Sequence, residues 1–181
     1  MLKLFREVLK VGTATLPYPF EPIEQMPGFR GKPHNDPEKC IACAACATAC
    51  PPNALNITTD LDQGVQTWSL FMGRCIYCGR CEEVCPTGAI MLSPDFELAV
   101  MNKQDLFERA DYRLATCRLC GNYFAPVKEI EYVSALLRQS NIPEDELNNT
   151  LSMLEVCPAC KRKNDVPKTV NLFQEEGSDV H

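Results

Sequence analysis

The chain has 181 residues, 24 acidic and 18 basic, and a formal net charge of −6 at pH 7. This acidic balance, without a basic run interleaved with aromatic residues, argues against binding to nucleic acid. No apolar stretch approaches the ~20 residues of a transmembrane helix. We find no signal peptide or twin-arginine segment, so we expect a cytoplasmic protein that is soluble or peripheral to a membrane. Twelve cysteines in such a chain indicate metal sites, not disulfides.

Residues 1–36 begin with an amphipathic segment. Its polar side carries mostly basic residues, and its apolar side consists of Leu2, Leu4, Phe5, Val8, Leu9 and Val11. Gly12 and four later prolines predict the end of this helix and an extended strap after it. The apolar side could pack on the protein's own core or dock outside it. A helix this short, set off by a strap, favours docking on a partner protein over bare lipid.

Two runs of four cysteines follow, displaced from each other by 35 residues. They are Cys40-x2-Cys43-x2-Cys46-x3-Cys50-Pro51 and Cys75-x2-Cys78-x2-Cys81-x3-Cys85-Pro86. This spacing is that of bacterial two-cluster ferredoxins, in which the fourth cysteine of each run ligates the other [4Fe–4S] cluster. The expected ligands are Cys40, Cys43, Cys46 and Cys85 for cluster one, and Cys50, Cys75, Cys78 and Cys81 for cluster two. Disulfide frameworks and zinc sites rarely show such runs.

The repeat extends over residues 37–93 and predicts an α+β, ferredoxin-like domain. Each half is expected to run from ligand loop to short helix, turn and strand. Leu55–Thr59 and Val65–Leu70 flank a turn-forming segment and predict a β-hairpin. The apolar residues expected to shield the clusters from water are Ile41, Leu55, Ile76, Val84 and Ile90.

Residues 94–174 carry the last four cysteines, in two C-x2-C pairs: Cys117, Cys120, Cys157 and Cys160. Paired knuckles of this kind predict one tetrahedral metal site, zinc-ribbon or rubredoxin-like, with zinc ahead of iron. Two dithiol redox pairs are the alternative, but they would need a thioredoxin-like βαβ unit that the pattern lacks. Two helices, Lys128–Gln139 and Glu144–Glu155, are expected between the knuckles, and a disordered tail is expected over 175–181.

Three pieces of sequence carry a resemblance to a known family. They are Gly12-Thr13-Ala14-Thr15-x-Pro17-Tyr18-Pro19, Gly28-Phe29-Arg30-Gly31-Lys32-Pro33, and the second cysteine run from Cys75 to Thr87. Over roughly residues 1–100 the chain resembles the ferredoxin-type subunit shared by respiratory complex I and membrane-bound nickel–iron hydrogenases. With the C-terminal cysteine pairs included, it is similar at nearly full length to the iron–sulfur subunit of formate hydrogenlyase and hydrogenase 4.

The resemblance implies a fixed place in a multi-subunit complex at the inner face of the cell membrane. Its two clusters would relay electrons from a formate dehydrogenase-linked iron–sulfur subunit to the small and large hydrogenase subunits. The N-terminal helix would lie beside a membrane-arm subunit. Such a subunit has no active site of its own.

Three other readings of the sequence stay open. One is a complex I-type ferredoxin subunit of a quinone-reducing dehydrogenase, which only the C-terminal cysteines separate from the hydrogenase subunit. A diffusible ferredoxin would not need the N-terminal helix or the C-terminal metal region. A nucleic-acid-binding redox sensor conflicts with the acidic charge.

Overall fold

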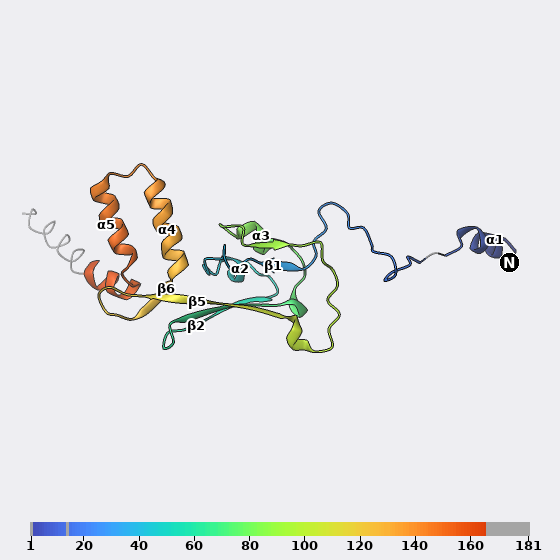
Figure 1. Ribbon diagram of the computed structural model, residues 1–181, viewed down its shortest axis with the longest axis horizontal. Helices are drawn as coiled ribbons and strands as arrows, with labels where there is room; N and C mark the ends of the chain where they lie inside the picture. The colour runs from blue at the N-terminus through green and yellow to red at the C-terminus, as the bar shows by residue number, and fades with distance from the viewer. Residues whose placement is uncertain (1, 14, 166–181) are drawn as a thin grey trace, which may run out of the picture.

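The computed structural model describes residues 2–13 and 15–165, apart from the side chain of Leu2. Figure 1 shows a mixed body of short helices and strands, with helix α1 (Leu2–Val11) at the end of a long strap on one side and the helices α4 and α5 on the other. No helix in the described part of the chain is both long and apolar enough to cross a membrane. The predicted disordered tail, 175–181, lies outside the described residues.

The helix α1 forms where the amphipathic pattern predicts it and ends at Gly12, whose N–H bonds to the Val8 carbonyl at 3.1 Å and whose φ is +61°. Its apolar side does not pack on the protein's own core. The five apolar residues with described side chains are 61–81% exposed: Leu4, Phe5, Val8, Leu9 and Val11. Packing on the core is therefore wrong for the described chain, and α1 presents an unpartnered apolar face.

The predicted hairpin is present as β2 (Leu55–Asp60) and β3 (Val65–Phe71). Asp60 Oδ1 accepts the N–H groups of Asp62 and Gln63 at 3.0 and 2.9 Å and closes the turn. Each cysteine run enters a short helix, α2 (Ala45–Thr48) or α3 (Arg80–Val84). A second small sheet pairs β1 (Pro33–Asn35) with β4 (Ile90–Leu92) in antiparallel fashion.

Two further strands extend the hairpin, although the sequence analysis had not predicted them. Strand β5 (Phe107–Thr116) pairs along all of β3, and β6 (Tyr123–Pro126) pairs with β5 in turn, which gives the antiparallel order β2-β3-β5-β6. Short 3₁₀ turns precede the second run and β5, at Met72–Arg74 and Lys103–Leu106. The rings of Phe71 and Phe107 stack at 4.4 Å where β3 and β5 meet.

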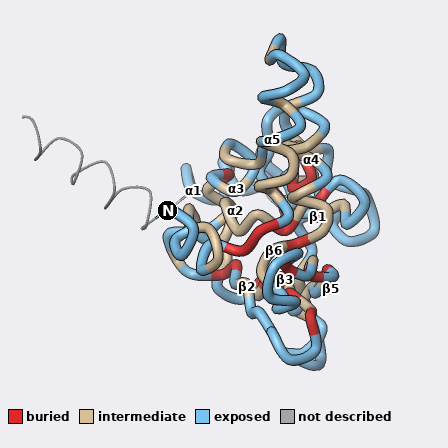
Figure 2. Tube along the Cα trace, turned by 90° about the vertical axis from the view of Figure 1, so that its left-hand side faces the viewer, coloured by how far each residue is buried: buried red, intermediate tan, exposed pale blue. Residues whose placement is uncertain are grey.

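The main core lies between this sheet and the cysteine loops. Alternate residues of β3 face inward, as the period of two in a strand requires, and Trp68 and Leu70 are each 1% exposed. Leu55 and Ile90 are buried as expected. Ile76, which was expected to shield a cluster, is 60% exposed. Figure 2 shows the buried residues gathered in the middle of the body.

The two C-terminal helices are confirmed as α4 (Val127–Gln139) and α5 (Glu144–Leu154), which lie side by side (Figure 1). Pro143 caps α5, and three acidic residues in its first turn suit the positive end of the helix dipole. Lys128 ties α4 to the body. Its Nζ donates to the carbonyls of Pro37 and Glu38 at 2.8 and 3.1 Å, and it lies 5.9 Å from the ring centroid of Tyr112.

Candidate metal centres

The first candidate site is a small, largely apolar cavity beside the first cysteine run. Three of its cysteines come from the first run and the fourth from the second, and they are Cys40, Cys43, Cys46 and Cys85. Ala42, Trp68 and Ile90 enclose it with apolar surface. The fold therefore brings together the four cysteines that the spacing assigned to cluster one. We call this space cavity one.

The second candidate site, cavity two, is of similar size and lies beside the second cysteine run. Its cysteines are the complementary set, Cys50, Cys75, Cys78 and Cys81. Cys50, from the first run, thus faces the loop of the second run. Both predicted sets of cysteines meet in space, and in both the fourth member comes from the other run.

The loops around the two cavities repeat an uncommon backbone conformation. Positive φ angles of 50–80° occur at three pairs of positions 35 residues apart: Ala42 and Tyr77, Ala44 and Gly79, and Asn53 and Gly88. For residues other than glycine this conformation costs about 1–2 kcal/mol. Left-handed residues among right-handed ones turn successive amides into a concave nest, which suits an anionic group such as an iron–sulfur cluster. The backbone is therefore shaped for such a ligand.

Backbone amides also bond to cysteine sulfurs at matched positions in the two halves. Ala54 N–H donates to Cys50 Sγ at 3.3 Å, and Ala89 N–H donates to Cys85 Sγ at 3.2 Å. Each donor follows its cysteine by four residues, directly after the helix turn. These bonds orient the two cysteines that cross between the runs.

Side chains outside the cysteine runs hold each ligand loop in place. The buried Gln66 donates through Nε2 to the Ala42 carbonyl at 2.6 Å, which fixes the loop of cavity one to strand β3. Arg30, from the strap, donates through Nη1 to the Cys78 carbonyl at 2.6 Å in the loop of cavity two. The strap is thereby attached to the second loop.

Burial opposes the ionisation of several of these cysteine thiols. Burial raises the pKa of the Cys46 and Cys75 thiols, and raises that of Cys81 to about 11. Such thiols ionise in a shared cavity when a metal supplies positive charge. The four-cysteine donor sets, the inward amides and the depth of the cavities all fit [4Fe–4S] clusters.

Three buried polar atoms have no hydrogen-bond partner among the described residues: Asn35 Nδ2, Trp68 Nε1 and Tyr112 Oη. Asn35 and Trp68 line cavity one, and Tyr112 packs in the same core cluster as Cys40. Burial, followed by the neighbouring Cys40, raises the pKa of the Tyr112 phenol, so the phenol keeps its proton. Unpartnered buried donors are rare, and a group rich in anionic sulfur would provide the missing acceptors.

A third candidate site joins the last four cysteines. Cys117 follows β5, Cys120 lies in the turn before β6, Cys157 follows α5, and Cys160 lies in the helical segment 158–165. Their four sulfurs lie within 4.8 Å of one another. The sulfurs of Cys120 and Cys157 are 3.7 Å apart, close to the ~3.8 Å edge of a tetrahedron with metal–sulfur bonds of about 2.3 Å.

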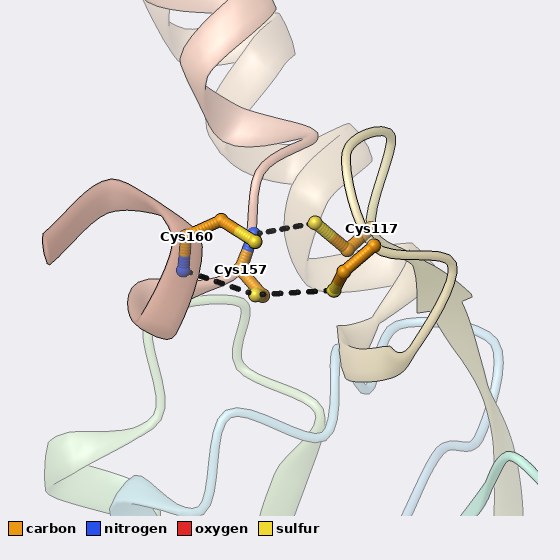
Figure 3. A group of neighbouring side chains, drawn as sticks. Cys117, Cys157 and Cys160 are labelled. Atoms are coloured by element: carbon orange, nitrogen blue, oxygen red, sulfur yellow. Dashed lines mark hydrogen bonds between the residues drawn. The ribbon is translucent and has the colours of Figure 1, made fainter. Parts of the chain in front are cut away.

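Figure 3 shows the sulfurs of this group turned toward one another, with backbone amides pointing at two of them. Cys157 N–H donates to Cys117 Sγ at 3.2 Å, and Cys160 N–H donates to Cys157 Sγ at 3.4 Å. The Cys157 amide lowers the pKa of Cys117 to about 6, whereas the hydrogen bond with Cys157 raises that of Cys160 to about 12. The group has the donor set and the spacing of a four-thiolate metal site.

Comparison with known proteins identifies the family. A family model described as a 4Fe-4S dicluster domain matches residues 39–89. Formate hydrogenlyase subunit 6 of Escherichia coli (strain K12) is 48% identical over 163 residues, which cover 90% of this chain and 89% of the relative. The chain belongs to the formate hydrogenlyase subunit 6 family. This result confirms the resemblance that the motifs indicated.

Other proteins match this chain over shorter segments. NAD(P)H-quinone oxidoreductase subunit I of Picosynechococcus sp. is 34% identical over 56 residues, which are 31% of this chain and 28% of that protein. A solved chain from the membrane-bound sulfane sulfur reductase, an archaeal respiratory membrane complex, aligns with a TM-score of 0.43. It is 30% identical and covers 57% of each chain.

Sequence reasoning missed three residues beside cavity one: Asn35, Trp68 and Tyr112. None of them belongs to a cysteine run, and Tyr112 lies in β5, beyond the dicluster match at 39–89. The available signal was the alternation of charged and apolar residues over 109–114, Arg-Ala-Asp-Tyr-Arg-Leu, which is typical of a half-buried strand.

The matched positions Ala44 and Gly79 give a prediction for loop stability. Gly79→Val places a β-branched side chain at φ +80° and should destabilise the loop of cavity two by about 1–2 kcal/mol. A Cβ at this position would meet Arg30 only at ordinary contact distances, so the cost comes from the backbone. We expect cluster absorption to be lost at lower temperature in the anaerobic holoprotein. Ala44→Gly, the control, removes the strain of a non-glycine residue at φ +64° and should not lower that temperature. Equal loss in both variants would contradict the prediction.

Proposed function

We propose that this chain is an electron-transfer subunit of a membrane-associated nickel–iron hydrogenase complex of the formate hydrogenlyase type. The observation that carries the proposal is the 48% identity to formate hydrogenlyase subunit 6 over nearly the full length of both chains. The two cavities, each lined by four cysteines, supply the ligands that two iron–sulfur clusters would need. Electrons would pass through two [4Fe–4S] clusters between a donor subunit and the hydrogenase.

Cysteine thiolates fill all four ligand positions at each cluster in this proposal. Cluster one is held by Cys40, Cys43, Cys46 and Cys85, and cluster two by Cys50, Cys75, Cys78 and Cys81. When bound, each cluster takes up and releases one electron. The chain's own part is to space the two sites, exclude water and direct amides at the sulfurs. With no open ligand position on the iron, the subunit performs no bond chemistry and has no substrate pocket.

We also propose a structural metal at Cys117, Cys120, Cys157 and Cys160, with zinc ahead of iron. It would join the β5–β6 turn to the end of α5, in a region whose small core cluster, among the described residues, is made of the buried Cys117, Val156 and Cys157. Anaerobic metal and sulfide analysis of the holoprotein checks the choice. About eight irons and one zinc per chain supports zinc, and about nine irons without zinc supports iron, at the same sulfide content.

The proposed partners are the hydrogenase small and large subunits, a formate dehydrogenase-linked iron–sulfur subunit and a membrane-arm subunit. Each region of the chain has its own proposed role. Residues 1–36 dock on a partner, 37–93 hold the clusters, and 94–174 form the helices joined by the structural metal. The exposed apolar side of α1 supports docking at residues 1–36. The complex would place this chain at the inner face of the cell membrane, peripherally.

Co-purification tests the assignment. The tagged chain is isolated anaerobically from gently solubilised membranes, and the proteins that come with it are identified by mass spectrometry. We expect a nickel–iron hydrogenase pair together with a formate dehydrogenase. A chain lacking residues 1–13 serves as the matched comparison and should lose most of its partners while keeping both clusters. Recovery of the full chain as a free monomer would contradict the proposal.

The crossed ligation gives a second prediction. Cys85→Ser should damage cluster one, since Cys85 lines cavity one and not the cavity of its sequence neighbour Cys81. The EPR spectrum of the reduced variant should therefore match that of Cys40→Ser. It should differ from that of Cys78→Ser, which removes a ligand of cluster two in either arrangement. A match to Cys78→Ser would show that the ligation is not crossed.

A complex I-type ferredoxin subunit of a quinone-reducing dehydrogenase is the second candidate. It is favoured by the 34% identity to an NAD(P)H-quinone oxidoreductase subunit I, although that match covers only 31% of this chain. Quinone-reductase subunits without a hydrogenase in the co-purification would support it. The proposed clusters would be the same in that case.

A further inference from the structure

The surroundings of the two cavities differ in a way that the paired cysteine runs do not. Three buried polar atoms lack a partner among the described residues: Asn35 Nδ2 and Trp68 Nε1 line cavity one, and Tyr112 Oη lies behind it, in the core beside Cys40. The Trp68 indole lies next to Cys46, and the Tyr112 phenol lies next to Cys40 with Asn35 beside it. One N–H donor and one O–H donor therefore lie beside Cys46 and Cys40, two of the proposed ligands of cluster one.

A third side-chain donor lies near Cys85, the proposed ligand of cluster one that comes from the second run. Thr87 Oγ1 lies 3.6 Å from Cys85 Sγ. A cysteine that ligates iron is a thiolate without a proton, so in the loaded protein the threonine hydroxyl must donate. The position 35 residues earlier, beside Cys50, is Pro52, which has no side-chain donor.

Cavity two lacks such a set. Among the described residues that line it, the polar side chains are Tyr77 and Arg80, neither of which is buried, and Arg80 is paired with Glu83 at 2.7 Å. Arg30 bonds to the Cys78 carbonyl and not to a sulfur, and its exposed charge is screened by water. The backbone bonds from Ala54 and Ala89 to sulfur are equivalent in the two halves, so they do not separate the clusters. Cavity two has one further amide donor, Tyr77 N–H to Cys75 Sγ at 3.4 Å, against the three side-chain donors at cavity one.

Hydrogen bonds to cluster sulfurs act on the reduction potential. Reduction adds one negative charge, and a donor aimed at a thiolate stabilises the reduced state more than the oxidised one. Burial acts in the opposite direction, but the two cavities are of similar size and are enclosed to a similar degree by largely apolar residues. The difference in side-chain donors therefore decides the order.

We propose that Tyr112, Trp68 and Thr87 raise the reduction potential of cluster one above that of cluster two. An electron that enters the subunit then rests on cluster one, at the side of the body covered by β5. These three are positioning residues that act through Cys40, Cys46 and Cys85. The inference rests on the proposed function, because it requires both clusters.

An EPR-monitored redox titration of the full-length holoprotein, prepared anaerobically, tests the proposal. Tyr112→Phe keeps the ring and removes only the hydroxyl, and Thr87→Val keeps the shape of the side chain. Each substitution should lower the reduction potential of cluster one. The equilibrium distribution of one electron between the two clusters should then shift toward cluster two by threefold to about tenfold, where tenfold corresponds to about 59 mV. Tyr123→Phe, which removes a phenol from β6, is the matched control and should shift neither potential. The spectrum of Cys85→Ser assigns the signal of cluster one.

The outcomes separate this inference from the proposed function. In the wild type, cluster one should be reduced first, and the lowered potential in the variants should belong to that cluster alone. Two intact clusters with unchanged potentials in Tyr112→Phe and Thr87→Val, or a shift on cluster two, would overturn the inference and leave the relay in place. A wild-type protein without two cluster signals would overturn both. Should Tyr112→Phe fail to retain cluster one, Thr87→Val, whose side chain is only half-buried, decides.

Discussion

The crossing of Cys50 and Cys85 between the two cysteine runs is the constraint on which the rest of the structure depends. Each cavity takes three cysteines from one loop and the fourth from the other half, so neither half forms its site alone. The short helices α2 and α3, each preceded by a left-handed residue at its N-cap, carry these two cysteines across. The backbone strain at Ala42, Ala44 and Tyr77 is tolerable because closing two sites at once can offset it.

The symmetry of the two halves ends where strand β5 begins. This strand pairs with β3 and brings Tyr112 against the core around cavity one. Lys128 then fastens α4 to the segment that leads into Cys40. The C-terminal region therefore supports one cluster more than the other, and two sites with the same ligands acquire different surroundings. In an electron relay, such a difference sets where charge rests.

Neither the N-terminal nor the C-terminal region has a large apolar core, and the two regions differ in what could stabilise them. The C-terminal helices gather around four converging sulfurs, a site at which a bound metal would replace missing apolar burial. The helix α1 has no such staple and leaves its apolar side in solvent. A helix with one exposed apolar side is stabilised by tertiary packing, which this chain by itself does not supply. That contrast is what supports docking as the role of residues 1–36.

The sequence by itself determined the features that depend on spacing between near neighbours. The cysteine runs predicted both sets of four that line the cavities, and local patterns predicted the hairpin β2–β3 and the helices α1, α4 and α5. Only the tertiary structure decided which distant residues meet those sites. Strand pairing between β3 and β5 brings Tyr112 into the core beside Cys40, whereas Ile76 stays 60% exposed although it lines cavity two. Such contacts depend on where whole strands pack, and no spacing along the chain encodes that.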